Sequence, residues 1–385
     1  MVNKILGGAG NNRNRVCFDS VGYRVMNIFR LIIPALLGCL LVSPTKALTI
    51  DIINTSASGA GMSANAFNAF ERAADTWSAL FTDPIVVTVD VGTASLGSTI
   101  LGSAFSVKLK ADFNAVRNVV IADAENEASN GVVAFLPDAG DFGAFLPGGF
   151  SLENFLTATR ANFKALGFSE AQTLTTKYGI TDAFITFSDG FAFDYNNSNG
   201  ITGGTIDFET VALHELGHAL GFVSVVDEVD ARLNENDPND SGVVSTHIFD
   251  LFRFEAADAP SSDAEFATAT RSLLPGGMTV FADGDDAFAL STGRFTGDGN
   301  QASHWLDGSF PGVELLGIMD PTLAAGQVID APSLADIRAL DLMGYDVAVP
   351  VPAALPLFGT GLGLLGIVGW RRRRRVVPAT AETAT

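Results

Sequence analysis

The spacing of apolar and polar residues predicts a mixed α and β chain. Residues 48–54 alternate apolar and polar side chains, as in a half-buried strand, and the valine-rich residues 84–92 predict a second strand. Between them, residues 64–81 place aromatic side chains such as Phe70 and Trp77 at helical spacing. We therefore expect strand, helix and strand in this order, with the aromatic side chains in the core.

Further elements follow along the chain. Residues 106–123 and 152–166 predict helices, and residues 182–195 predict two strands around a turn at 188–190. Residues 333–343 predict a capped helix that ends before a glycine. These patterns are weaker than the first three, but they extend the α+β organisation through the chain.

Another predicted helix, at residues 211–222, carries the clearest candidate chemistry. Asp207 can cap its start, and Gly221 lies where a left-handed C-cap is wanted. Residues four apart share one face of a helix, so His214 and His218 can bind one metal ion through neutral ring nitrogens. The spacing predicts a metal site, and a buried helix with two chance histidines is the weaker alternative.

Glu215 lies between these histidines in the sequence and points about 100° away from His214 because of the helix pitch. That direction suits a general base acting on metal-bound water better than a third ligand. Zinc is the metal that this spacing indicates, and it lowers the pKa of bound water to about 7. The HExxH motif therefore predicts zinc-assisted hydrolysis with Glu215 as the catalytic residue.

A catalytic zinc site usually has three protein ligands and one open position, so a third ligand must come from elsewhere. Two more histidines, His247 and His304, are present. His247 lies in a segment that alternates like a strand, where a core or surface histidine without metal is the ordinary interpretation. Carboxylates downstream of the helix are the remaining candidates: Asp227, Glu228, Asp230 and Glu235.

Two more motifs follow the histidine helix. The chain has HExxHxxGF in residues 214–222, then His304 followed by Trp305, and then Met319 in a predicted tight turn. This order resembles the leishmanolysin branch of the metzincin metalloproteases. By that resemblance His304 is the third zinc ligand and Met319 lies beneath the metal, whereas Ser224 stands where other metzincins carry their third histidine.

The resemblance covers about residues 205–225 and 300–346. It implies a zincin-like catalytic domain over residues 48–349, in which two subdomains flank the active-site helix. The upper subdomain would run to about residue 221 and the lower one over 222–349. The predicted initial strand, helix and strand suit the sheet that backs the active-site helix in such a fold.

The N-terminal residues are typical of a targeting segment. An apolar run at residues 31–42 follows a short positive region and precedes a small-residue cleavage site that ends at Ala47. We therefore assign residues 1–47 to an N-terminal extension and secretory signal peptide. Both cysteines, Cys17 and Cys39, lie in this segment, so we expect a mature protein without disulfides.

The other end contains an uncharged apolar segment of 18 residues, 353–370, followed by five arginines at 371–375. Such a segment can span a bilayer as a transmembrane helix, with the arginines on the cytoplasmic side. With Pro350 and Pro352, residues 350–375 resemble a PEP-CTERM sorting signal. That resemblance implies an exosortase-type processing enzyme, anchoring in the inner membrane before processing, and a cell-surface or extracellular location afterwards.

The net charge of the chain limits the classes of molecule that it is expected to bind. Residues 48–349 hold 12 Lys and Arg against 41 Asp and Glu, a formal charge of −29. This acidity argues against nucleic acid as a partner and suits a secreted protein. Three loops, at 234–242, 283–286 and 297–300, are dense in oxygen ligands for structural Ca²⁺. None has the EF-hand spacing, so solvated turns are favoured.

The sequence thus predicts a secreted or surface zinc metalloendopeptidase acting on protein or peptide substrates, with His214, His218 and His304 as metal ligands. A strand within residues 182–195 is a candidate edge on which an extended substrate pairs, and a core hairpin is an equally good interpretation. The alternative function is a non-catalytic extracellular matrix or adhesion protein with a structural metal site. Glu215 favours the enzyme, because a structural site needs no base.

Overall fold

The computed structural model describes residues 47–348, apart from residues 56–58, 126–129 and 238–239. Apart from Ala47, the expected signal peptide and the expected sorting signal lie outside this part. Within the described part, no helix is both long and apolar enough to cross a membrane. Helices and strands are interspersed along the chain, and the strands form several sheets. This mixture confirms the predicted α+β class.

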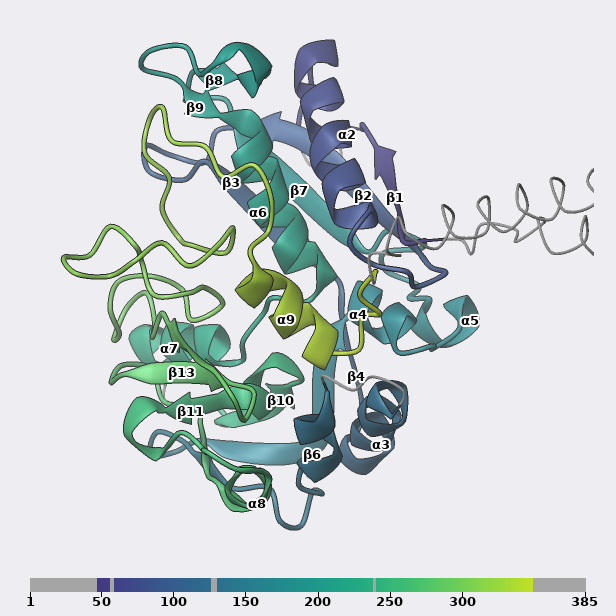
Figure 1. The fold of residues 1–385 in the computed structure, drawn as a ribbon, viewed down its shortest axis with the longest axis vertical. Coiled ribbons are helices and arrows are strands. Elements are labelled where there is room, and N and C mark those ends of the chain that lie inside the picture. Colours follow the sequence, from purple (N-terminus) through teal and green to yellow (C-terminus); the bar gives the residue numbers. More distant parts are fainter. Residues whose placement is uncertain (1–46, 56–58, 126–129, 238–239, 349–385) are drawn as a thin grey trace, which may run out of the picture. The chain divides into compact units, whose positions relative to one another are not determined.

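The first sheet has four strands, ordered β1 (Thr49–Ile53), β2 (Val86–Ala94), β7 (Ala183–Ser188) and β3 (Gly102–Ser106) (Figure 1). Strands β1, β2 and β7 run parallel, and β3 is antiparallel to β7. Helix α2 (Ala64–Ser78) connects β1 to β2, so the predicted strand, helix and strand are confirmed.

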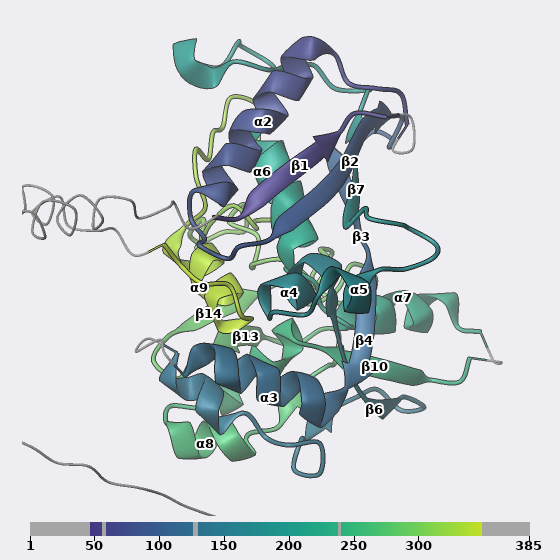
Figure 2. The ribbon, with the colours of Figure 1, turned by 90° about the vertical axis from the view of Figure 1, so that its right-hand side faces the viewer.

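Helices α2 and α6 (Phe208–Leu220) pack side by side against this sheet (Figure 2). The aromatic side chains of α2 are buried, as expected from their spacing. Phe70 packs edge-on against Phe187 of β7, and the indole N–H of Trp77 donates to the carbonyl oxygen of Leu213 at 2.9 Å. This buried bond ties α6, the histidine helix, directly to α2.

The prediction of helices at residues 106–123 and 152–166 is wrong for the first half of each segment. Four elements take their place: β4 (Lys108–Asp112), α3 (Phe113–Ala124), β6 (Ser151–Thr159) and α4 (Arg160–Ala165). Asp112 and Thr159 cap the two helices through their side chains. Strands β4 and β6 pair with each other, and this long-range pairing overrides the local helical pattern.

Strand β6 also pairs on its other side with β10 (Val243–His247), so segments before and after α6 share one sheet. Helix α7 (Val226–Glu235) follows α6 closely. Shorter elements complete this region: β5 (Ala144–Phe145), α5 (Glu170–Thr173), β11 (Arg253–Glu255), α8 (Asp263–Thr268), β12 (Arg271–Ser272), β13 (Thr279–Ala282) and β14 (Ala287–Leu290).

Residues 182–195 contain two strands, as predicted, but the strands do not pair with each other. Strand β7 lies between β2 and β3, whereas β8 (Phe193–Asp194) pairs with β9 (Ile206–Asp207). The longer of the two strands is therefore internal. The free edge of the sheet beside α6 belongs to β3 instead.

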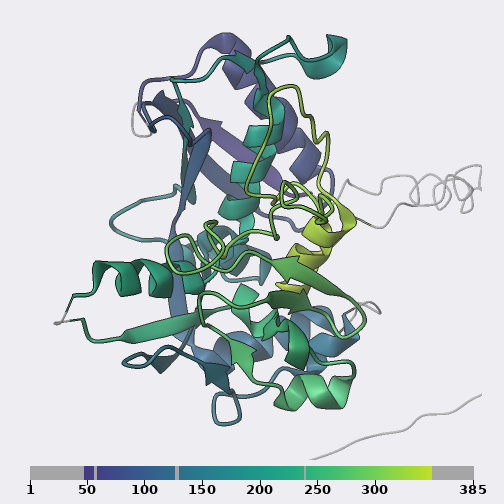
Figure 3. The ribbon, with the colours of Figure 1, turned by 90° about the vertical axis from the view of Figure 1, so that its left-hand side faces the viewer.

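Residues 291–333 form long loops between β14 and α9 (Leu334–Leu342), and these loops run along α6 (Figure 3). The predicted helix at 333–343 is confirmed, with Ser333 and Asp336 in a capping box. The loops carry His304 and Met319, so their course decides which side chains meet the histidine helix.

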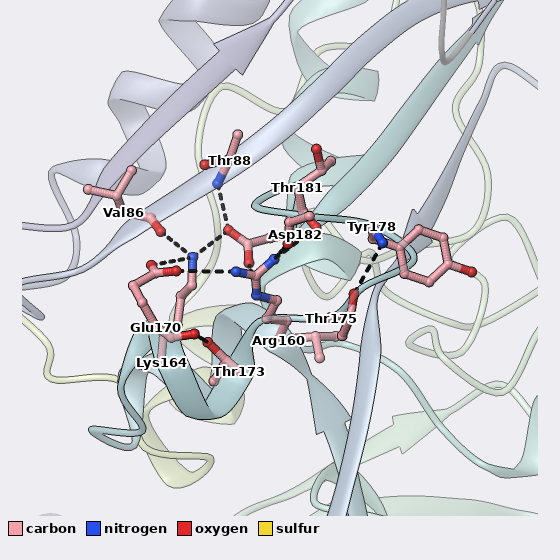
Figure 4. A network of polar contacts seen from close by, with 12 residues as sticks. Val86, Thr88, Arg160, Lys164, Glu170, Thr173, Thr175, Tyr178, Thr181 and Asp182 are labelled. Atoms are coloured by element: carbon pink, nitrogen blue, oxygen red, sulfur yellow. Dashed lines mark hydrogen bonds and ion pairs between the residues drawn. The ribbon is translucent and has the colours of Figure 1, made fainter.

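A buried ion-pair network joins α4 to the sheet (Figure 4). Asp182, just before β7, accepts hydrogen bonds from Lys164 Nζ at 2.8 Å and from the N–H of Thr88 at 2.7 Å. Its other oxygen lies 3.2 Å from Arg160 Nε. These three charged side chains are buried, whereas the side chain of Glu170, which also contacts both cations, is 63% exposed.

We expect Asp182→Ala to lower the free energy of unfolding by about 3–5 kcal/mol, because it removes the buried carboxylate of two buried cations and leaves them only the exposed Glu170. The matched control Glu170→Ala removes an exposed partner of the same cations and should cost about 0–1 kcal/mol. Urea unfolding followed by tryptophan fluorescence measures both changes. Equal losses in the two variants would contradict the dominant role of Asp182.

Candidate metal centre and its cleft

Helix α6 has the N-terminal cap that its sequence predicts, and it ends at Gly221 as expected, although φ 158° and ψ −2° at Gly221 are not the left-handed helical conformation. The carboxylate of Asp207 accepts from the backbone N–H of Thr210 at 3.1 Å and from its hydroxyl at 2.6 Å, so the helix start is capped. At the other end, the N–H of Gly221 donates to the carbonyl oxygen of Gly217. These contacts fix the helical turn that places the first two histidines on one face.

The structure brings the side chains of His214, His218 and His304 together. Their Nε2 atoms lie 3.1–3.2 Å from one another. In a tetrahedral zinc site with ligands about 2.0–2.1 Å from the ion, ligand atoms lie about 3.3–3.4 Å apart. The three nitrogens therefore outline one face of such a tetrahedron, and the side chains fit a divalent metal ion.

Each of these imidazoles is oriented through its other ring nitrogen. The Nδ1 atoms lie 2.7–3.0 Å from backbone carbonyl oxygens, which belong to Ile318, Phe222 and Gln301, respectively. A carbonyl oxygen can only accept, so each Nδ1 carries the proton. Each Nε2 consequently presents its lone pair to the centre of the cluster.

Burial favours the neutral form of all three rings. It lowers the pKa of His218 to about 3, lowers the pKa of His214, and holds the pKa of His304 well below its usual value. Metal ligation requires deprotonated nitrogens, which this environment supplies at neutral pH. Three converging lone pairs repel one another unless a cation lies between them, so this donor set fits a metal.

Two of the candidate carboxylate ligands hold the loop that carries His304. Asp227 accepts from the N–H of Ala302 and from the hydroxyl of Ser303. Asp230 accepts from the N–H of Phe295 at 2.7 Å. Their role in the structure is therefore to position the loop.

The remaining candidate ligands also lie away from the cluster. Glu228 pairs with Arg232 at 3.0 Å, and Glu235 is exposed at the end of α7. His247 is buried, and its Nδ1 lies 3.3 Å from the carbonyl oxygen of Val223. Among the described residues, the three clustered histidines are the one group of three or more acidic, histidine or cysteine side chains close enough to share an ion.

Met319 is fully buried against the histidine helix. A β-carbon at Gly217 would lie only 2.3 Å from the Met319 sulfur, so the thioether needs a glycine at this helical position. A glycine inside a helix costs about 1 kcal/mol relative to alanine. The close approach of Met319 explains why Gly217 occurs here.

Asp336 fixes the loop around Met319, a role that its sequence context does not predict. Its carboxylate accepts from the indole N–H of Trp305 at 2.7 Å, from the N–H of Ile318 at 2.8 Å and from the N–H of Ser333 at 2.7 Å. It therefore joins the residue after His304, the residue before Met319 and the start of α9. In the sequence, an aspartate in a first helical turn signals only a cap.

Glu215 lies against the edge strand of the sheet. A β-carbon at Gly102 of β3 would lie 2.6 Å from Glu215 Oε1, so the strand approaches the carboxylate closely. Burial raises the pKa of Glu215 to about 8, although a backbone hydrogen bond from Ala104 opposes this shift. A bound cation would favour the carboxylate. A carboxyl group in this range can both accept and donate a proton near neutral pH.

The three histidines and Glu215 line one cleft of about 1030 Å³. Residues 102–106 of the free edge strand β3 also line it. Near the start of α6 the lining is mainly apolar, with Ile206, Val211 and Ile329 beside Thr210. Beyond the end of α6 the lining is polar and includes Ser224. The cleft therefore offers different surroundings on the two sides of the histidine cluster.

The carboxylates of the acidic loops contact the protein itself. Asp240 pairs with Arg232, Asp283 pairs with Arg338, and Asp298 accepts from the backbone of its own loop. These contacts are those of ordinary turns and ion pairs. Structural calcium stays a prediction from the sequence, with no gathered set of acidic ligands among the described side chains.

No family model, curated protein or solved structure matches the chain. The function is therefore inferred from the geometry of the cleft and its histidines.

We expect His304→Ala to weaken metal binding more than about 100-fold, since even second-shell changes cost 10–100-fold in affinity. His247→Ala is the matched control, because it removes a buried histidine outside the cluster. Metal content after dialysis against a weak chelator, together with circular dichroism to check folding, measures the effect. Equal metal retention in the two variants would remove His304 from the site.

Proposed function

We propose that this protein is a zinc-dependent endopeptidase of the metzincin type, with an arrangement similar to that of leishmanolysins. The observation that carries the proposal is the meeting of three neutral imidazoles with Glu215 in one cleft. Two histidines come from one turn of α6, and the third comes from a loop 86 residues further along the chain. The three histidines and Glu215 therefore supply, in one cleft, the metal ligands and the base that hydrolysis needs.

Zinc is the metal that this site suits best. Three neutral nitrogen donors at nearly tetrahedral spacing are typical of catalytic zinc, whereas calcium and magnesium prefer oxygen ligands. When bound there, zinc would polarise a substrate carbonyl and lower the pKa of a water molecule. His214, His218 and His304 would hold it.

Glu215 is the general base of the proposed reaction. Its carboxylate accepts a proton from the attacking water and then delivers that proton to the nitrogen of the leaving amine. The close packing against Gly102 restricts the carboxylate to one region of the cleft. Its buried position excludes bulk water and so strengthens its electrostatic interactions.

Strand β3 is the proposed platform for the substrate backbone. It is the edge strand of its sheet, and it lines the cleft beside the histidines. An extended peptide can add to such an edge by backbone hydrogen bonds, which do not depend on side-chain identity. Unfolded proteins and peptides are therefore the substrate class that we propose.

The place of action follows from the two ends of the sequence. We propose export through the inner membrane, processing by an exosortase-type enzyme, and activity at the cell surface or outside the cell. The high density of acidic residues suits a protein that works in that environment.

We expect Glu215→Ala to lower kcat on unfolded casein by at least about 10²–10⁴-fold, because general base catalysis contributes on that scale. Zinc content should stay near that of the unchanged protein, since Glu215 is not a ligand. His304→Ala serves as the comparison that loses metal and activity together. Full proteolysis by Glu215→Ala would refute its role as base.

A further inference from the structure

Two positive side chains that line the cleft form no ion pair with any described carboxylate. Lys108, at the start of β4, and Arg294, in the loop after β14, are both exposed. Of the ion pairs among the described residues, none involves either of them. With 12 Lys and Arg against 41 Asp and Glu in residues 48–349, exposed positive charge of this kind is scarce.

Both cations lie towards the C-terminal end of α6. Lys108 follows Ser106 closely in the chain, and the Ser106 hydroxyl donates to the carbonyl oxygen of His218 at 2.9 Å. Arg294 follows Gly293, where an added β-carbon would lie 3.0 Å from the carboxyl carbon of Asp230 in α7. The two side chains therefore lie on the polar side of the histidine cluster, opposite the apolar start of α6.

The described carboxylates on this side of the cleft form no ion pair with these cations. Asp227 is occupied by Ala302 and Ser303, and Glu228 pairs with Arg232. The polar side of the cleft thus keeps two exposed positive charges, although the chain as a whole is strongly acidic. A negatively charged group that reaches this side can pair with one or both of these cations.

We propose that Lys108 and Arg294 form an anion-binding subsite. It binds a carboxylate of the substrate on one side of the cleaved bond, the side that lies beyond His218 in the cleft. This inference rests on the proposed peptidase function and adds a substrate preference to it. The carboxylate can belong to an Asp or Glu side chain or to a peptide C-terminus. Each exposed pair contributes modestly, so together they should change selectivity by about threefold to tenfold.

The test uses the full chain loaded with zinc and short fluorogenic peptides that carry Glu or Gln at one position at a time around an apolar centre. One set has amidated C-termini and the other has free C-termini, which separates the two sources of carboxylate. We expect kcat/KM to favour Glu about threefold to tenfold at positions on one side of the cleaved bond only. The preference should shrink in about 1 M NaCl, where charges are screened within about 3 Å.

Lys108→Met and Arg294→Met should each reduce this preference, measured within each variant as the ratio of kcat/KM for the peptide with the carboxylate to kcat/KM for its matched neutral peptide. Lys177→Met is the matched control, because Lys177 is exposed but lies over Tyr178 and does not line the cleft. It should keep the full preference. A preference that survives both cleft substitutions, or no preference for a carboxylate of either source, would overturn the subsite.

Binding of the same peptides, followed by fluorescence anisotropy, separates this inference from the proposed function. Tighter binding of Glu peptides that depends on Lys108 and Arg294, without any cleavage, would support the subsite and refute the peptidase. Cleavage with equal kcat/KM and equal affinity for Glu and Gln peptides, and for free and amidated C-termini, would refute the subsite and support the peptidase.

Discussion

Three imidazole lone pairs point at one spot in the cleft, and much of the surrounding structure serves to hold them there. Nitrogen atoms 3.1–3.2 Å apart with no protons between them repel one another. Hydrogen bonds from each Nδ1 to a backbone carbonyl oppose that repulsion by fixing each ring. The geometry becomes favourable only when a cation takes the lone pairs, so the cluster is best understood as a metal site.

Buried carboxylates also hold the histidine cluster in place, because they fix the loop that carries His304. The loops between β14 and α9 contain no regular elements that would satisfy their backbone N–H groups. Asp227, Asp230 and Asp336 accept several of these groups at once, and they do so at the points next to His304 and Met319. A carboxylate is the strongest acceptor for this purpose, and desolvation is its cost, as the raised pKa of Asp227 shows.

Local sequence was enough to predict the histidine helix, its N-terminal cap and the first strand, helix and strand. The position of His304 could be expected only from the order of motifs, because a loop brings it to the helix from far along the chain. Gly102, Gly217 and Asp336 could not be assigned their roles, since each acts through a segment that is distant in sequence. The same limit explains the wrong helical starts at residues 106–112 and 152–159, where pairing between β4 and β6 decides the structure.

A contribution to stability does not explain why a glutamate is buried at position 215. Its presence favours the proposed enzyme over a protein with a structural metal. Its pKa is raised from 4.5 to about 8 by burial, so the folded state binds its proton more tightly than the unfolded state does. Without a bound cation, stability is therefore lost as pH rises from about 4.5 towards 8, and the ionised group is unfavourable at neutral pH. A structural site also takes four protein ligands as a rule, whereas the described side chains supply three and the remaining face meets a large cleft. A buried carboxyl group beside three metal-ligating nitrogens is the arrangement that the proposed zinc-assisted hydrolysis would use.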